Sequence, residues 1–405
     1  MQDTMPTSHL SAHFPLKHIV WLALALSTGA ALSLGITRFS YGLLLPPMRA
    51  DLNWSYTLAG AMNTVNALGY LLGALVTPGL LHRHGASRVL MAGAVLASLF
   101  MGLSGFFTDT AFLLVQRLLA GVASALVFIA GGLLAARLGA LQPGRGGFLI
   151  GLYYGGTGFG IVLSALLVPV VLAAAGELPH GWTWAWWALA LACVAVTALL
   201  LWPARVLLQL APVAAMGDST AVAFSWRPLG FALAGYAMFG VGYIGYMTFV
   251  IALLKEQGAS GAEITVFYAL LGLAVLASSR IWARMLDRYK GGQVLALLCA
   301  LLGLATVLPA LTTAWPVIIA SGVLFGAVFL SLVASTTALV RHNLPQAAWA
   351  KGISAFTIVF AAGQIVGPTM VGWIADGPGG LARGLVCSAI ALWLGAALAW
   401  RQRAL

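Results

Sequence analysis

Charged residues are scarce in this chain of 405 residues, and their scarcity excludes an ordinary soluble protein. Only 7% of the residues are charged and 61% are hydrophobic, whereas about 25% of the residues in a typical soluble domain carry a charge. A soluble core could not bury so much apolar surface. We therefore expect a polytopic membrane protein.

Cysteine and acidic residues are also rare, and their positions argue against several kinds of site. Cys193, Cys299 and Cys387 each lie in an apolar run, where a thiol is usually a small apolar filler, so we expect no disulfide. All nine acids lie outside the apolar runs, and no close cluster of His, Asp and Glu occurs within them. This pattern predicts no metal site, no cofactor and no catalytic residues, and it argues against a membrane enzyme.

Apolar runs of about 20 residues, the length that spans a bilayer as a helix, recur along the whole chain. The sequence thus predicts an all-α membrane protein with twelve transmembrane helices. We expect the first run to be retained rather than cleaved, because no small-residue cleavage site follows it. The runs lie near 18–46, 55–81, 87–107, 110–136, 147–175, 182–202, 228–254, 264–284, 293–312, 315–340, 352–375 and 384–400.

Basic residues are distributed unequally between the two sides of the predicted membrane. With the N-terminus in the cytoplasm, fourteen basic residues fall inside and only Arg49, Lys255 and Arg383 fall outside. By the positive-inside rule, both termini are cytoplasmic, which suits a bacterial inner membrane. The net charge of +11 then reports topology and contact with the anionic inner leaflet rather than a nucleic-acid partner. The inside residues are Lys17, Arg83, Arg88, Arg137, Arg145, Arg205, Arg227, Arg284, Arg288, Lys290, Arg341, Lys351, Arg401 and Arg403.

The two halves of the chain resemble each other when one is shifted by 205 positions against the other. Arg83 then meets Arg288, and Val89-Leu90 meets Val294-Leu295. Six runs followed by six runs is the arrangement of two parallel repeats related by an axis along the membrane normal. The sequence predicts an N-terminal tail, a six-helix bundle, a flexible cytoplasmic linker, a second six-helix bundle and a C-terminal tail, over 1–17, 18–202, 203–227, 228–400 and 401–405.

The loop after the second run carries a motif. Gly79–Arg88 reads GLLHRHGASR and is similar to the cytoplasmic loop motif G-x-L-x-D-R-x-G-R-R of the major facilitator superfamily, with His82 in place of the aspartate. The equivalent loop of the second repeat keeps the aspartate, as Asp287 before Arg288. An acid at the end of one helix can sit against the N-terminus of a neighbouring helix and hold a gate shut; the alternative is that these residues only determine topology. The gating candidates are Arg83, Arg88, Asp287 and Arg288.

Two further segments carry the same resemblance, which covers the whole chain. Arg117–Ala125 resembles the R-x-x-x-G-x-G-x-A pattern of the superfamily's fourth helix, with one glycine replaced by alanine. Gly35–Tyr41, followed by Leu45–Met48, is similar to the YbfB/YjiJ-type branch. The resemblance implies the major facilitator fold, in which two six-helix bundles alternate access to a central cavity lined by the first, fourth, seventh and tenth helices.

Three arginines lie within the predicted spans, and no protein carboxylate lies at membrane depth to neutralise them. A central arginine costs about 2.5–3.5 kcal/mol on insertion scales, so it usually faces water or a partner. An anionic ligand would complete such a site, because arginine holds a carboxylate through two parallel hydrogen bonds. Other interpretations stay open: Arg38 could snorkel to the outer interface, Arg117 could hydrogen-bond backbone in its own half, and Arg280 could reach water at the inner surface.

Tyrosines accompany these arginines. Tyr41 shares a helix face with Arg38, and the repeat partner of Arg38 is Tyr243, with Tyr246 beyond it. Further polar residues could line a cavity or could hydrogen-bond a neighbouring helix, namely Asn63, Asn66, Tyr153, Tyr154 and Gln364. The expected substrate-binding residues are Arg38, Tyr41, Arg117, Tyr243, Tyr246 and Arg280.

These features predict a monomeric secondary transporter that moves a small organic anion, such as a carboxylate, by alternating access. No GxxxxGK[ST] phosphate loop is present, so we do not expect ATP to drive it. The alternative is proton-coupled efflux of amphipathic compounds, which needs a titratable group at mid-membrane, where the charged residues are all arginines. The sequence leaves open whether a proton is the coupling ion and in which direction transport runs. It also leaves open a receptor or a lipid scramblase in place of a carrier.

Overall fold

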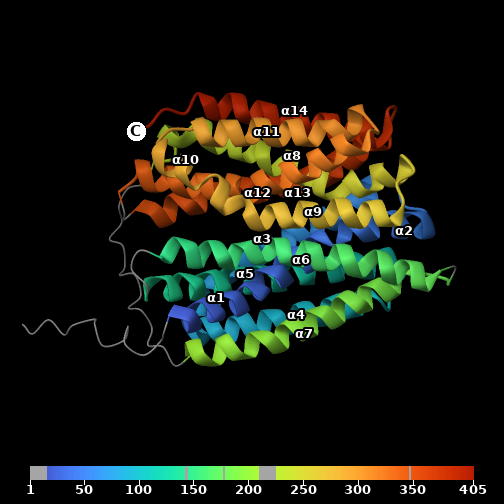
Figure 1. The fold of residues 1–405 in the computed structure, drawn as a ribbon, viewed down its shortest axis with the longest axis horizontal. Helices are drawn as coiled ribbons and strands as arrows, with labels where there is room; N and C mark the ends of the chain where they lie inside the picture. Colours follow the sequence, from blue (N-terminus) through green and yellow to red (C-terminus); the bar gives the residue numbers. More distant parts are fainter. Residues whose placement is uncertain (1–15, 142–144, 177, 209–224, 346–347) are drawn as a thin grey trace, which may run out of the picture.

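The computed structural model describes residues 16–141, 145–176, 178–208, 225–345 and 348–405. Within these residues, twelve helical segments are long and apolar enough to cross a membrane, as predicted. They form two six-helix bundles, one from each half of the chain (Figure 1). Most spans extend a few residues beyond the predicted apolar runs, because polar residues continue the helices past them: the eighth span covers Gly261–Arg288.

The first bundle is built from the first six spans. Its opening span is a composite of α1, η2 and α2, whereas each of the other five is a single helix. The elements are α1 Leu16–Ala30, η2 Ala31–Phe39, α2 Tyr41–Leu52, α3 Tyr56–His84, α4 Ala86–Ser104, α5 Thr110–Ala140, α6 Gly146–Ala175 and α7 Trp182–Leu208.

The second bundle repeats this order. The second span of this bundle, the eighth of the chain, is divided into α9 and the short α10. The elements are η3 Arg227–Leu229, α8 Gly230–Glu256, α9 Gly261–Ile281, α10 Ala283–Arg288, α11 Gln293–Leu311, α12 Trp315–Asn343, α13 Trp349–Ala375 and α14 Gly380–Trp400. Of the expected linker over 203–227, residues 203–208 belong to α7, and residues 209–224 lie outside the described residues, as does most of the expected tail over 1–17.

Equivalent residues begin equivalent helices in the two halves. Ser55 caps α3 by accepting a hydrogen bond from the Leu58 backbone N–H at 3.1 Å, and its repeat partner Ser260 caps α9 in a capping box with Glu263. Such side chains satisfy N–H groups that have no intrahelical partner. The local signals that start the helices therefore support the internal repeat.

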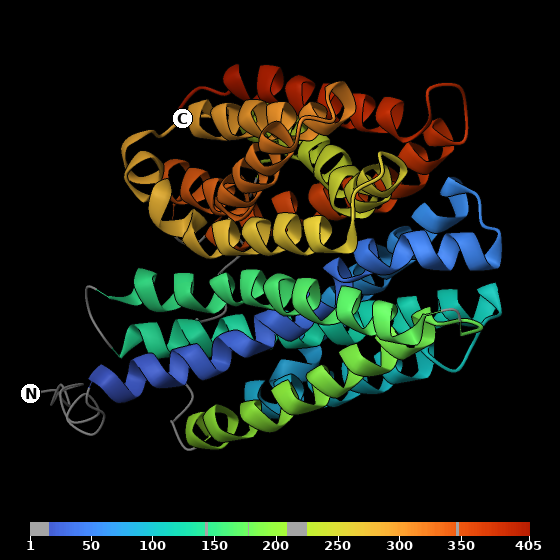
Figure 2. The same ribbon diagram turned by 45° about the vertical axis from the view of Figure 1, so that its right-hand side comes forward.

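The molecule has two ends, which we name by the chain termini. α1 begins and α14 ends at the same end, on the left in Figure 1 and Figure 2, and we call it the terminal face. The other end, where α2 and α13 end and α3 and α9 begin, is the opposite face. Consecutive spans run in opposite directions. The end of a helix at which a residue lies therefore tells which face it is nearer.

The two bundles meet along α3 against α13 and along α6 against α9; α6, in green, and α9, in yellow, lie side by side in Figure 2. Glycine permits this close approach, since a Cβ atom on Gly60 would lie 2.3 Å from the Pro368 carbonyl oxygen and one on Gly158 would lie 2.4 Å from that of Gly272. Among the described residues, the hydrogen bonds between the bundles join the first three turns of α3 and the end of η2 to α8, α9 and the C-terminal half of α13. The bundles are thus joined toward the opposite face.

The first span changes its winding near its middle. Residues 31–39 form the π-helix η2, all nine of them buried, and Arg38 lies in its last turn. A π-helix is rare and often marks a functional position, because its wider turn displaces side chains from the regular register. It places Thr37 and Arg38 where η2 packs against α5 and α6, with Tyr70 of α3 near the Arg38 guanidinium.

Candidate binding site around Arg38

Arg38 is a buried cation that the protein leaves incompletely paired. Its side chain is 2% exposed, and among the described residues its Nε and Nη2 atoms have no hydrogen-bond partner. The guanidinium carbon lies 5.9 Å from the centre of the Tyr70 ring, on α3, and Tyr243, on α8, lies close enough to interact electrostatically with it. Its burial inside the bundle argues against snorkelling to the lipid interface.

Aromatic residues of the second bundle face this arginine. The Tyr243 hydroxyl donates a hydrogen bond to Gln364 Oε1 at 2.7 Å, from α8 to α13. Its ring stacks on Phe329 and Phe360, with centroids 5.2 and 5.5 Å apart. We define the Arg38 cluster as Arg38, Tyr70, Tyr243 and Gln364; it joins both bundles across their contact.

Arg117 is equally buried, but the protein pairs both of its Nη atoms, and only its Nε lacks a partner among the described residues. Its Nη1 donates to the Thr37 carbonyl oxygen at 2.8 Å and its Nη2 donates to Asn63 Oδ1 at 2.9 Å, while its guanidinium carbon lies 5.0 Å from the centre of the Tyr41 ring. Asn66 Nδ2 donates to the Arg117 carbonyl oxygen at 2.9 Å. These contacts are of the kind expected from the alternative interpretation of Arg117, hydrogen bonding within its own half.

The remaining predicted binding residues lie apart from Arg38 or are engaged elsewhere. Tyr41 donates its hydroxyl to the Ala59 carbonyl oxygen at 2.8 Å. Tyr246 shares a hydrogen bond of 2.7 Å with Ser321 Oγ. Arg280 is exposed at the end of α9, with its guanidinium carbon 5.6 Å from the centre of the Phe148 ring. Of the six predicted residues, the structure therefore brings only Arg38 and Tyr243 into one cluster, with Arg117 adjacent.

The predicted gating residues all lie at the terminal face. Arg83, Arg88, Asp287 and Arg288 are exposed, and Arg288 lies 6.0 Å from the Tyr289 ring centre. In the part of the chain that the structure describes, the only ion pair joins Asp51 to His180 at 2.6 Å. The four gating candidates are thus unpaired in this conformation, and their role in closing the terminal face stays a proposal.

Tyr70 is the cluster residue that our sequence reasoning missed. It lies on α3 at i+4 from Asn66 and i+7 from Asn63, so the three polar residues share one helix face. That spacing was the available signal. The Tyr70 ring also contacts Phe128, with centroids 6.4 Å apart, so α5 supports it from behind.

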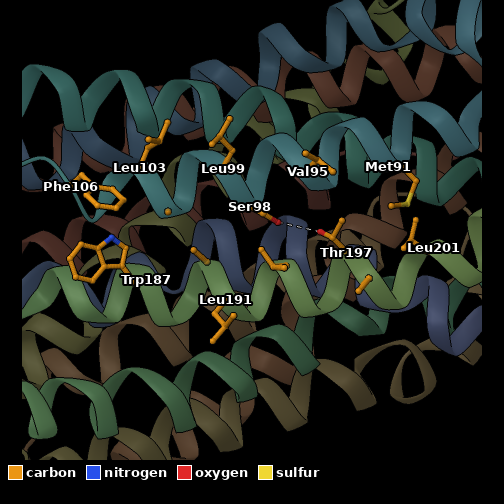
Figure 3. Close-up of a pocket in the computed structure, with 14 residues that line it drawn as sticks. Met91, Val95, Ser98, Leu99, Leu103, Phe106, Trp187, Leu191, Thr197 and Leu201 are labelled. Atoms are coloured by element: carbon orange, nitrogen blue, oxygen red, sulfur yellow. Dashed lines mark hydrogen bonds between the residues drawn. The ribbon is translucent and has the colours of Figure 1, made fainter.

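An apolar groove lies elsewhere, on the outer side of the first bundle between α4 and α7 (Figure 3). It encloses about 760 Å³ and has no charged lining residue. Ser98 and Thr197 hydrogen-bond each other at its floor, 3.2 Å apart, and Leu191 on its rim is 70% exposed. An outward-facing apolar groove on a spanning bundle suits lipid and offers nothing to an anion. Within the described residues, no group of three His, Cys, Asp or Glu side chains could hold a metal ion.

Comparison with known proteins identifies the family. The model of a family described as "Uncharacterised MFS-type transporter YbfB" matches residues 30–400. The chain belongs to this family of major facilitator transporters. A sequence comparison with curated proteins gives no match.

Solved major facilitator structures share the fold. A bacterial homologue of the human lysosomal transporter Spinster, in an inward-facing and unoccupied conformation, has a TM-score of 0.72 over 96% of this chain and 97% of that chain, at 15% identity. The nucleoside transporter NupG has a TM-score of 0.70 over 94% and 98%, at 14% identity. Such identities show the fold alone. The predicted fold class and family are confirmed, and the protein is a multi-pass membrane transporter rather than an enzyme.

Proposed function

We propose that this major facilitator transporter is a secondary carrier of a small organic anion and that Arg38 binds the anion's carboxylate. The observation that carries the proposal is that Arg38 Nε and Nη2 are buried without partners. These two nitrogens lie on the same edge of the planar guanidinium, which is the edge that holds a carboxylate through two parallel N–H···O bonds. A buried charge without a partner is costly, and an anion that binds and leaves would relieve that cost.

The neighbours of Arg38 suit an anion better than a cation. No acid lies within the membrane-depth part of any predicted span, and the second cation, Arg117, lies close enough to repel Arg38. The Tyr70 hydroxyl and the Gln364 amide N–H groups can donate hydrogen bonds to a carboxylate or to a polar substituent, and the Tyr243 hydroxyl, which donates to Gln364 Oε1, orients that amide. We expect a compact mono- or dicarboxylate to fit these donors.

Alternating access is the mechanism that the contact between the bundles supports. The inter-bundle hydrogen bonds of the described residues lie toward the opposite face, and the fourteen-to-three distribution of basic residues favours a cytoplasmic terminal face. We infer that the opposite face is held closed in this conformation, as in a carrier that opens toward the cytoplasm; the similar Spinster homologue has an inward-facing conformation. Because the embedded charges are cationic, anion exchange, or entry of the anion together with a proton, is the coupling that fits.

The test is counterflow of labelled carboxylates in proteoliposomes, which only a carrier performs. Arg38→Lys keeps the charge but loses the two-pronged contact, and Arg38→Gln loses both, so we expect counterflow to fall at least about tenfold in each. The matched control is Arg403→Gln, which removes an exposed cation at the terminal face. Counterflow at parental rates in both Arg38 variants would refute the assignment.

A binding assay separates loss of substrate contact from loss of folding. A ligand at 100 times its dissociation constant stabilises the folded state by about 2.7 kcal/mol. A carboxylate that raises the unfolding temperature of the parent protein should leave that of Arg38→Gln unchanged. Efflux of a cationic compound driven by inward protons, with no effect of carboxylates, would instead favour the drug-export alternative.

A further inference from the structure

The contact between the bundles at the opposite face includes one acid that lies on a helix end of the other bundle. Asp376 follows the last residue of α13. Its Oδ1 accepts a hydrogen bond from the Tyr56 backbone N–H at 2.7 Å, and its Oδ2 accepts from the Thr57 backbone N–H at 2.8 Å and from the Thr57 hydroxyl at 2.6 Å. Tyr56 and Thr57 are the first two residues of α3. One carboxylate of the second bundle thus accepts three hydrogen bonds from the first bundle.

These hydrogen bonds complete a helix cap. The first N–H groups of a helix have no intrahelical acceptor, and the partial positive charge at that end favours an anion. Ser55 supplies the cap from within the first bundle, but its hydroxyl reaches only the Leu58 N–H. Asp376 takes the two preceding N–H groups, so the cap of α3 is shared between the bundles.

A second contact reinforces the first through the same tyrosine. The Tyr56 hydroxyl donates to Glu256 Oε1, at the end of α8. Arg49, from α2, places its guanidinium carbon 3.7 Å from the centre of the Tyr56 ring, and its charge also acts on Asp376. Two acids of the second bundle therefore converge on the start of α3 beside one arginine of the first.

The backbone at this contact is too close to accommodate a side chain. A Cβ atom on Gly372, one turn before Asp376, would lie 2.2 Å from the Tyr56 carbonyl oxygen. The sequence thus supplies glycine where α13 crosses α3 and an acid where α13 reaches the N–H groups of α3. Because glycine lets α13 approach α3 closely, the Asp376 carboxylate lies within hydrogen-bonding distance of the first N–H groups of α3.

We propose that Asp376 is the latch of the opposite face: a helix cap donated across the two bundles, which must break before that face opens. The latch rests on alternating access in the proposed function but not on the identity of the substrate. Its strength sets the populations of the two access states, because the cap exists only when the opposite face is closed.

Spin labels on both bundles measure opening of the opposite face without any transport assay. Thr108 and Thr313 are repeat partners in exposed turns of this face, one in each bundle. We would label Thr108→Cys and Thr313→Cys in a Cys387→Ser background, since Cys193 and Cys299 are buried. The distance distribution between the labels then reports the closed and open populations in the full-length carrier.

Asp376→Ala removes the shared cap, and we expect the long-distance population to rise about fivefold, as for loss of a helix N-cap. Asp376→Asn keeps an acceptor but loses the charge, so a smaller rise is expected; it also serves if the alanine variant folds poorly. The matched control is Asp109→Ala, since Asp109 caps α5 from within its own bundle on the same face, at 2.9 and 3.1 Å from the backbone nitrogens of Ala111 and Phe112.

Two outcomes would overturn the latch. Unchanged distances in both Asp376 variants would show that the cap does not hold the face closed, and an equal rise in Asp109→Ala would show that any cap loss loosens it. The result is independent of substrate identity. A rise confined to the Asp376 variants, together with absent carboxylate counterflow, would support the latch and refute the anion proposal.

Discussion

Arg38 and Arg117 lie at similar depth in one bundle and are each 2% exposed, yet the protein treats them differently. Arg117 donates to a backbone carbonyl and to an asparagine side chain, whereas the Nε and Nη2 atoms of Arg38 donate to nothing among the described residues. Both arginines carry the cost of burial. The hydrogen bonds of Arg117 help hold η2, α3 and α5 together, and we propose that Arg38 keeps its free donors for a ligand.

The contacts around Arg117 show how the two arginines are related. Its Nη1 bonds the carbonyl of Thr37, the residue next to Arg38. Its partner Asn63 donates through Nδ2 to Thr248 Oγ1, at 2.8 Å, in the second bundle. Arg117 therefore fixes the backbone that carries Arg38 and, through Asn63, reaches the contact between the bundles.

The largest expected difference between the two arginines is in stability. Arg117→Met breaks two interhelical hydrogen bonds worth about 0.6–1.7 kcal/mol each, and it leaves Asn63 Oδ1 and the Thr37 carbonyl without that partner. Arg38→Met removes a buried charge that has incomplete pairing, so we expect equal or higher stability. Thermal unfolding of the two variants in detergent, without ligand, measures the contrast.

Two results of this unfolding experiment would contradict the roles assigned to the two arginines. If Arg38→Met lowers the unfolding temperature as much as Arg117→Met does, Arg38 supports the fold and the proposed ligand contact loses its basis. If Arg117→Met unfolds at the parental temperature, its hydrogen bonds contribute little and the structural role assigned to it is wrong.

A smaller effect is expected at the tyrosines of α8. Tyr243→Phe removes the hydroxyl that meets Gln364 beside Arg38, and the loss of one hydrogen bond of about 0.5–1.5 kcal/mol should weaken carboxylate binding by roughly 2- to 13-fold. Tyr246→Phe removes a hydroxyl that bonds Ser321 within the second bundle, so binding should change less. Dissociation constants from ligand-induced thermal shifts compare the two, and equal losses would place the site on a wider part of α8.

Features that depend on local sequence were predictable, whereas partners across the bundle were not. The apolar runs locate the spans because a lipid-exposed helix must be apolar along its length, and the Arg83/Arg288 correspondence exposes the repeat. The hydrogen-bonding partners of Arg117 depend on how η2, α3 and α5 are rotated about their axes, which hydropathy does not specify. The acid at position 376 was recognisable as lying outside the membrane, but its partner Tyr56 is 320 positions away.

The smallest effect that we expect is a pH dependence of the contact between the bundles. Burial raises the pKa of Asp376, but the hydrogen bonds from Thr57 and Tyr56 and the nearby charge of Arg49 lower it more, so the net pKa lies below its usual value. The closed latch therefore binds protons more weakly than the open one, where these hydrogen bonds are absent. Closure is fully supported above the ordinary aspartate pKa of about 3.9 and is lost as the pH falls through the lowered value.

With spin labels at positions 108 and 313, we thus expect no change in the distance distribution between pH 7 and about pH 5, and a growing long-distance population below about pH 4. Asp376→Ala should abolish this dependence, because it removes the carboxylate that accepts the hydrogen bonds of Tyr56 and Thr57. A transition that persists unchanged in Asp376→Ala would show that Asp376 does not set the pH dependence of this contact and would leave it as a cap without pH sensitivity.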